Sequence, residues 1–293
     1  MTGQILALSG GVGGAKLVWG LARVVAPERL AVVCNTGDDF VHLGLPICPD
    51  LDTVLYTLAG CADPERGWGV AGESWRVLER LGALGGPTWF RLGDLDLATH
   101  LRRAELLASG ATLSEATAAL ARALGVAVAV LPMSDDPVAT LVDTDEGTLP
   151  FQHYFVARRC EPRVGGFRFA GIDAARPQPR FLALLEDPTL AAVILCPSNP
   201  FVSLDPILAL PGVRARLAAC PAPVVAVSPI VGGRALKGPA AKMLAELGLP
   251  VWTAWRWPAA TRISSTASSW IARTPTGPRR SRASASPRWW RPR

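Results

Sequence analysis

The segment 5–34 constrains the fold of this chain more strongly than any other feature. A short apolar run at 5–8 leads into a glycine-rich loop, apolar positions at helical spacing follow, and a fully apolar run rich in β-branched residues closes the unit at 30–34. This order predicts a βαβ unit. Similar apolar runs return at 126–131, 192–196 and 224–227. Because amphipathic stretches separate them, we expect an α/β fold, an open, mainly parallel, Rossmann-like sheet flanked by helices.

Residues 1–251 carry this pattern and are expected to form one α/β domain. The part between about 60 and 125 is predicted to be mostly helical and to form a cap-like insertion. The part at 151–180 is predicted to be irregular or antiparallel. From 252 to 293 the patterning stops, and Arg, Trp, Ser and Pro dominate. Either this tail is a basic disordered arm, or it is out-of-frame translation of a GC-rich gene, and we favour the second interpretation.

The charge distribution argues against a nucleic-acid partner. The formal net charge is +6, but residues 252–293 hold nine of the 30 basic residues and none of the 24 acidic ones. The first 251 residues therefore carry 21 basic and 24 acidic residues, a net charge of −3. No apolar stretch approaches the ~18 residues of a membrane span. The chain runs into its first strand without a signal-like leader, and its six cysteines form no C-x-x-C pair, so a cytoplasmic protein is expected.

The glycine-rich loop runs from Ser9 to Lys16, between the first strand and the first helix. Its backbone N–H groups can converge on an anion at a helix N-terminus, which suits a phosphate. It matches neither the dinucleotide fingerprint nor a Walker A loop, and a tight turn is an alternative. The predicted nucleotide-binding residues of this loop are Ser9, Gly10, Gly11, Gly13, Gly14 and Lys16.

Acidic residues follow the second strand and begin the next helix. Asp38 and Asp39 lie in an Asn-Thr-Gly-Asp-Asp segment that starts at Asn35, and Asp50 and Asp52 lie in a Pro-Asp-Leu-Asp segment. Asx turns and a helix N-cap explain such residues structurally. Beside a phosphate loop they would instead suit Mg²⁺, which takes one or two carboxylates together with phosphate oxygens. We therefore predict Asp38, Asp39 and Asp52 as metal ligands.

Three later segments complete the candidate set. Arg91 precedes Gly-Asp at a helix start, where it is either a solvated charge or a fork for a phosphate or ring carbonyl. Ser198 and Asn199 follow one predicted strand, and a Gly-Gly pair at 232–233 follows another. Turn chemistry explains each loop alone, but parallel strands would bring all of these loops to one edge of the sheet.

In order along residues 4 to about 250, eight motifs of this chain resemble those of the 2-phospho-L-lactate transferase family. They are the glycine loop, Asn35–Asp39, Cys48–Thr53, Leu92–Asp94, Leu131–Pro137, Phe151–Gln152, Pro197–Pro200 and Val227–Ile230. The resemblance implies an Mg²⁺-dependent transfer of a phospholactyl or phosphoenolpyruvyl group. The implied donor is linked to guanosine diphosphate, and the acceptor is 7,8-didemethyl-8-hydroxy-5-deazariboflavin, in coenzyme F-420 biosynthesis with release of GMP.

The resemblance also implies roles for single residues. Asp52 and Arg91 match the deazaflavin-binding pair and are our predicted catalytic residues, with Asp50 and Asp94 as further substrate contacts. The predicted contacts with guanosine diphosphate are the glycine loop, Asn35, Ser198, Asn199, Gly232 and Gly233. A homodimer is expected only from base rates. The rival interpretations are a non-enzymatic nucleotide-sugar-binding regulator with the same fold and, more distantly, a nicotinamide-dependent oxidoreductase.

Overall fold

The computed structural model describes residues 3–249 except 232–233 and 236–237. Its centre is a five-stranded, wholly parallel sheet in the order β10-β9-β1-β2-β5. The predicted α/β fold is therefore confirmed. The strands of this sheet are β1 (Ile5–Ser9), β2 (Leu30–Cys34), β5 (Ala129–Pro132), β9 (Ala192–Leu195) and β10 (Val224–Ala226).

Helices cover both faces of the sheet. Along β1, Leu6 and Leu8 join one buried cluster and Ala7 joins the other, because successive side chains of a strand point to opposite faces. The first cluster includes residues of α6, α7 and α8, and the second includes residues of α1, α2 and α5. The bounds are α1 (Gly11–Leu21), α2 (Pro49–Ala59), α5 (Leu113–Ala123), α6 (Pro179–Glu186), α7 (Asp205–Ala209) and α8 (Val213–Ala219).

The strand order places a topological switch point between β1 and β9. The chain proceeds from β1 to β2 and β5 on one side, and β9 and β10 extend the sheet on the other. In an open α/β sheet, ligands bind beyond the carboxyl ends of the strands at such a point. The glycine loop follows β1 and the Pro197–Pro200 segment follows β9, so two predicted motifs meet there.

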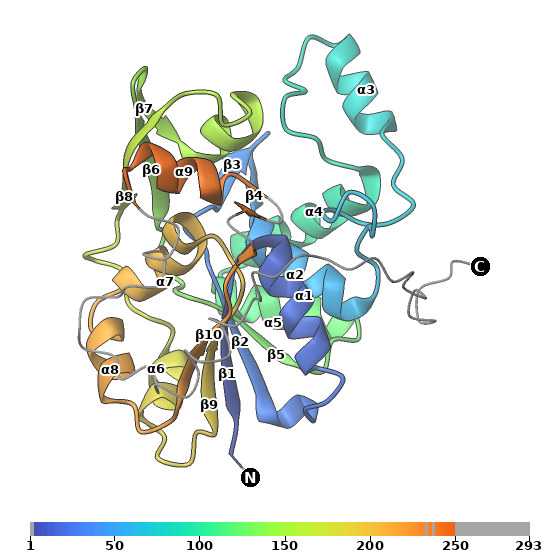
Figure 1. The fold of residues 1–293 in the computed structure, drawn as a ribbon. Coiled ribbons are helices and arrows are strands. Elements are labelled where there is room, and N and C mark those ends of the chain that lie inside the picture. The colour runs from blue at the N-terminus through green and yellow to red at the C-terminus, as the bar shows by residue number, and fades with distance from the viewer. Residues whose placement is uncertain (1–2, 232–233, 236–237, 250–293) are drawn as a thin grey trace, which may run out of the picture.

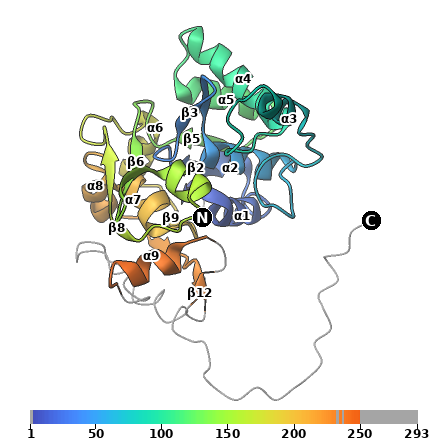
Figure 2. The same cartoon turned by 90° about the horizontal axis from the view of Figure 1, so that it is seen from above.

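Two excursions from the α/β core lie on opposite sides of the molecule, beyond the carboxyl edge of the sheet (Figures 1 and 2). One holds α3 (Arg76–Ala83) and leads into α4 (Asp94–Ala108). The other is an antiparallel sheet in the order β7-β6-β8, on which α9 packs. The antiparallel excursion was predicted, but it starts at 139, earlier than expected. The predicted cap-like insertion is narrower than 60–125, because α5 packs on β5 as part of the helical layer.

Shorter elements complete the part of the chain that the structure describes. The β3–β4 hairpin turns through Leu43 and Gly44, both at positive φ. Two π-helical turns, η2 and η3, face the carboxyl edge of the sheet from the second excursion and from the loop after β9. The remaining bounds are η1 (Pro27–Arg29), β3 (Phe40–His42), β4 (Leu45–Ile47), β6 (Ala139–Thr144), β7 (Gly147–Pro150), η2 (His153–Ala157), β8 (Val164–Ala170), η3 (Pro200–Leu204), β11 (Ile230–Val231), β12 (Arg234–Ala235) and α9 (Ala240–Glu246).

The predicted tail at 252–293 lies outside the described residues. Among the residues that are described, no helix is both long and apolar enough to cross a membrane.

Candidate active site

A cavity of about 950 Å³ opens at the carboxyl edge of the sheet. Both excursions, the glycine loop and the loop after β9 contribute to its wall. Ten of the predicted site residues line it: Gly10, Gly11, Gly13, Lys16, Asp38, Asp50, Asp52, Arg91, Ser198 and Asn199. The structure thus brings together residues from five motifs that lie far apart in the sequence.

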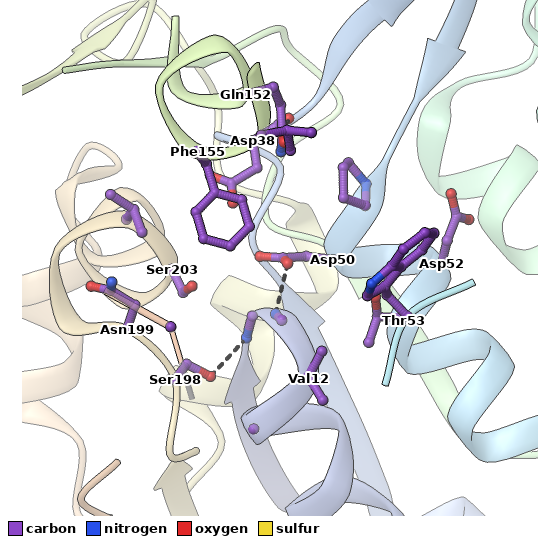
Figure 3. A pocket seen from close by; sticks show the side chains of 18 of the residues that line it. Val12, Asp38, Asp50, Asp52, Thr53, Gln152, Phe155, Ser198, Asn199 and Ser203 are labelled. Carbon is purple, nitrogen blue, oxygen red and sulfur yellow. Dashed lines mark hydrogen bonds between the residues drawn. The ribbon is translucent and has the colours of Figure 1, made fainter. Parts of the chain in front are cut away.

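Two N–H groups of the glycine loop already have partners. The Gly10 N–H donates to Ser198 Oγ at 3.0 Å, and the Gly11 N–H donates to Asp50 Oδ1 at 2.7 Å (Figure 3). Asp50 was considered an N-cap of its own helix, but its carboxylate caps α1 instead. The first four N–H groups of a helix have no intrahelical acceptor, so the amides that follow Gly11 in the first turn of α1 are the ones that can meet an anion.

Close packing explains the glycines of this loop. A Cβ on Gly13 would lie 2.3 Å from the carbonyl oxygen of Pro197, and a Cβ on Gly14 would lie 2.3 Å from Ser9 Oγ. Helix α1 can therefore approach the loop after β9 only with glycine at these positions. A tight turn alone would not require this contact, which joins the two sides of the switch point.

Ser9, Gly14 and Asn35 are buried and lie beneath the cavity wall rather than in it. The Asn35 side chain donates to Asp50 Oδ2 at 2.9 Å and to the carbonyl of Val202 at 3.1 Å. Asn35 therefore holds Asp50 in place. This placement differs from the predicted direct contact of these three residues with a nucleotide.

Asp38 and Asp50 form an acidic pair at the cavity (Figure 3). Burial raises the pKa of Asp50 to about 6, against hydrogen bonds from Asn35 and Gly11 that lower it. Burial and the neighbouring charge of Asp50 raise the pKa of Asp38 well above its ordinary value. The Oδ1 atom of Asp38 is buried without a hydrogen-bond partner in the described part of the chain. A bound cation would compensate the negative charge of both carboxylates.

Asp39, the other predicted metal ligand of this segment, does not line the cavity. Burial raises its pKa, and a hydrogen bond with Cys48 and the charge of Arg103 lower it. Asp38 therefore lines the cavity and Asp39 does not, although the sequence predicted the same role for both. Within the described ranges, no group of three or more His, Cys, Asp or Glu side chains is arranged to hold a metal ion.

Asp52 lies at the cavity and pairs with a buried arginine. Arg103 Nη2 donates to Asp52 Oδ1, and both side chains are at most 5% exposed. His100 lies beside this pair, with Nδ1 3.7 Å from Asp52 Oδ2 and Nε2 3.2 Å from Asp96 Oδ1. The hydroxyl of Tyr56 donates to Asp96 Oδ1 at 2.8 Å, which extends the network.

Sequence reasoning missed Arg103. It lies three residues after His100 in an amphipathic helix, where an arginine is ordinarily a solvated charge. No local pattern distinguishes it, because its partner Asp52 is 51 positions away. His100 is buried in the same network and also lines the cavity.

Arg91 lines the cavity, and its guanidinium lies 4.3 Å from the centre of the Trp75 ring. Asp94, predicted as a substrate contact, lies outside the cavity lining. Its carboxylate accepts from Ser74 Oγ and from the Val77 N–H, and these bonds lower its pKa. Asp94 therefore anchors the segment before α3.

On the loop after β9, Asn199 Oδ1 accepts from the Phe201 N–H at 3.0 Å and forms the N-cap of η3. Ser198 and Asn199 both line the cavity (Figure 3), and their contact with a nucleotide stays a prediction. Gly232 and Gly233 lie outside the described residues.

Comparison with known proteins identifies the family. The profile of the family described as "2-phospho-L-lactate transferase CofD" matches residues 5–278. This chain belongs to that family. The CofD-family chain is 45% identical over 252 residues to a phosphoenolpyruvate transferase of Kitasatospora aureofaciens, an alignment that covers 84% of this chain and 78% of the relative. It is 39% identical over 247 residues to a 2-phospho-L-lactate transferase of Methanosarcina mazei, covering 84% and 80%.

The CofD-family chain also shares its fold with a member of the UPF0052 family from Bacillus halodurans. The TM-score is 0.55 at 16% identity, and the match covers 77% of this chain and 69% of the other. At this identity the likeness concerns the fold alone.

Proposed function

We propose that this CofD-family chain transfers a phosphoenolpyruvyl or phospholactyl group from a guanosine diphosphate-linked donor to 7,8-didemethyl-8-hydroxy-5-deazariboflavin, releasing GMP, in coenzyme F-420 biosynthesis. Membership of the family supports the transfer itself. The observation that carries the proposal is that Asp52, Arg91 and the glycine loop line one cavity. A guanylated donor and a deazaflavin together need a large cavity, and the volume of this one lies at the upper end of the range of about 300–1,000 Å³ that is common for ligand sites.

In the proposed reaction, the terminal ribityl hydroxyl of the deazaflavin attacks the phosphorus that bears the acid. A new O–P bond forms, the P–O bond to GMP breaks, and the hydroxyl proton passes to a carboxylate. We assign this proton to Asp52. Its Oδ1 is bound to Arg103, while Oδ2 has no hydrogen-bond partner within the described chain. The rest of the catalysis is alignment of the hydroxyl with the leaving group.

Mg²⁺ is part of the proposal, and Asp38 with Asp50 fits it better than the predicted set of Asp38, Asp39 and Asp52. A magnesium ion takes one or two carboxylates and completes its shell with phosphate oxygens and water. The unpartnered Asp38 Oδ1 and the raised pKa of both residues suit such a ligand pair. When bound, the ion would supply charge neutralisation at the phosphates.

The donor is proposed to carry enolpyruvate rather than lactate. Support comes from sequence identity, which is 39–45% to the phosphoenolpyruvate transferases compared and 39–40% to the 2-phospho-L-lactate transferases. We place the reaction in the cytoplasm, and the homodimer stays a prediction.

The test is direct incubation of the protein with the deazaflavin, Mg²⁺ and either guanylated donor, with GMP and the deazaflavin product followed by chromatography. We expect product with both donors and faster turnover with the enolpyruvyl donor. If neither donor gives product, the proposal is contradicted. Binding of a nucleotide sugar by the same inactive protein would instead favour the regulator.

A further inference from the structure

Two successive residues after η2 adopt a backbone conformation that side chains disfavour. Arg159 has φ +50° and Cys160 has φ +59°, in the left-handed region. Within the described part of the chain, Leu43 in the β3–β4 hairpin is the other non-glycine residue at positive φ. Such strain persists where the surrounding structure imposes it, and it concentrates at ligand-binding sites.

Fixed contacts on both sides impose this turn. The Arg158 N–H donates to the carbonyl of His153 at 2.8 Å, and the Cys160 N–H donates to the carbonyl of Tyr154 at 2.9 Å. These two backbone bonds hold the turn, and Arg159 lies between them and lines the cavity. The partly exposed Arg158 side chain points elsewhere and pairs with Glu146 at 2.5 Å, on the turn between β6 and β7. The left-handed turn thus gives two adjacent arginines different environments.

The cations of the cavity differ in whether they are already neutralised. Arg66 pairs with Asp63 at 2.8 Å, and Arg91 lies over the Trp75 ring. The side chains of Lys16 and Arg159 have no hydrogen bond or ion pair with the described residues, and both residues are exposed and line the cavity. A guanidinium without a protein partner is available to bind a carboxylate or a phosphate through two parallel hydrogen bonds.

The position of η2 indicates which substrate Arg159 meets. Phe155 of this π-helix points toward Asp50 and Ser203, above the N-terminal end of α1 (Figure 3). Phe151 stacks on Phe155 with ring centres 5.3 Å apart. The turn at 158–160 follows directly, so Arg159 enters the cavity from the element that covers the glycine loop. The phosphates of a nucleotide donor are proposed to bind at this loop.

We propose that Arg159 is a substrate-binding residue that recognises an anionic group of the guanylated donor, either the carboxylate of the transferred acid or a phosphate. This inference rests on the proposed function and extends it to the donor side of the site. It also explains the strained turn, because the left-handed backbone orients Arg159 toward the cavity while Arg158 stays paired with Glu146.

The test compares Arg159→Gln, Arg159→Lys and the matched control Arg158→Gln. In steady-state assays we expect Arg159→Gln to raise the KM for the donor about tenfold or more, because a charge-assisted bidentate contact is lost. The KM for the deazaflavin should stay unchanged. Arg159→Lys should recover part of the affinity, and Arg158→Gln should behave as the wild type. An unchanged donor KM in Arg159→Gln, or an equal rise in Arg158→Gln, would overturn the inference.

Calorimetric titration with GDP separates the two anionic groups, since GDP carries the phosphates but no acid. Weaker GDP binding by Arg159→Gln would assign the contact to a phosphate, and unchanged GDP binding with a raised donor KM would assign it to the carboxylate. Arg159→Gly checks folding, because glycine adopts a positive φ without strain. This variant should unfold at a temperature close to that of the wild type and still lose donor affinity.

Binding measurements also distinguish a failure of this inference from a failure of the proposed function. If the wild type binds the guanylated donor but yields no product, the proposed transfer is wrong, and the dissociation constants of the wild type and Arg159→Gln still test the contact. A wild-type protein that binds neither donor nor GDP would overturn both.

Discussion

Two walls of the cavity are built in different ways. The glycine-loop wall, made of Gly10, Gly11, Gly13, Asp50 and Ser198, comes from elements of the parallel sheet and is joined by hydrogen bonds of 2.7–3.0 Å. The aromatic wall, made of Arg66, Trp68, Trp89, Phe90 and Arg91, comes from the segment between α2 and α4.

Ring contacts hold the aromatic wall, and it lies outside the sheet. Phe90 packs edge-on against Phe40 at 4.9 Å, and Trp89 lies 4.6 Å from the His153 ring. Trp68 is 38% exposed. Contacts of this kind allow side chains to adjust, whereas a backbone amide bonded to a buried carboxylate has one arrangement. We therefore expect substitutions in the glycine-loop wall to act on the fold of the site, and substitutions in the aromatic wall to act on affinity for one substrate.

Asp52, from the helix that also carries Asp50, should show the largest effect on turnover. Asp52→Asn is expected to lower kcat by about a hundredfold to ten-thousandfold, the usual contribution of a positioned proton acceptor. Asparagine keeps an oxygen for Arg103. Asp52→Ala would remove the partner of a buried arginine, which costs about 3–5 kcal/mol, so that variant is expected to destabilise the fold as well.

Chromatographic assays measure the effect of Asp52→Asn on turnover, and thermal unfolding measures its effect on stability. Asp136→Asn is the matched control, because Asp136 also pairs with an arginine, Arg176, but does not line the cavity. Equal turnover for wild type and Asp52→Asn would remove Asp52 from the mechanism.

Gly13→Ala tests the rigidity of the glycine-loop wall. Its Cβ would lie 2.3 Å from the Pro197 carbonyl oxygen, so α1 must move away from the loop after β9. We expect a loss of stability of about 1–3 kcal/mol, as for other overpacked sites, together with weaker GDP binding in calorimetry. In the same helix, a Cβ on Gly20 meets nothing within 4 Å. Gly20→Ala should therefore raise stability by about 0.5–1 kcal/mol. Similar effects of the two substitutions would contradict the close packing.

The sequence predicted the parts of this site that depend on local pattern. The βαβ unit, the later parallel strands and the glycine loop follow from periodicity and turn chemistry, and parallel strands then bring their loops to one edge. Side-chain partners across long sequence separations were not predictable. A local N-cap explained Asp50 from the sequence, but its carboxylate accepts from Gly11, 39 positions away. No local pattern singles out Arg103, which pairs with Asp52. Asp38 and Asp39 are adjacent and chemically identical, so only the fold distinguishes them.

Arg91→Gln tests the aromatic wall. Arg91 has no carboxylate partner within the described residues and lies over Trp75, so its loss should leave the fold intact. We expect the KM for the deazaflavin to rise about tenfold with little change in kcat, because the lost contact serves ground and transition states alike. Arg102→Gln, which removes an exposed arginine paired with Glu105, is the control. A fall in kcat with an unchanged KM would assign Arg91 to the chemical step instead.

Asp50 should also make the stability of the protein depend on pH. The pKa of Asp50 is raised from 3.8 to about 6, so folding favours its protonated form. The stabilisation from protonation is fully present below about pH 4 and is lost as the pH rises through about 6, by up to about 3 kcal/mol for two pKa units. In Asp50→Asn the free energy of unfolding should therefore change less between pH 4 and 6. Part of the slope should remain, because the pKa of Asp38 is raised as well.

Urea unfolding at a series of pH values measures this slope. Asp136→Asn is the control, because the pKa of Asp136 is shifted in the opposite direction to that of Asp50. Arg176 lowers the pKa of Asp136 to about 2, so its stabilisation is present above about pH 4 and is lost as the pH falls through about 2. Removing Asp136 should leave the slope between pH 4 and 6 unchanged. If Asp50→Asn also leaves the slope between pH 4 and 6 unchanged, then Asp50 is not the charge that the glycine-loop wall buries. The rigidity of the glycine-loop wall would then come from packing against Pro197 rather than from the carboxylate that caps α1.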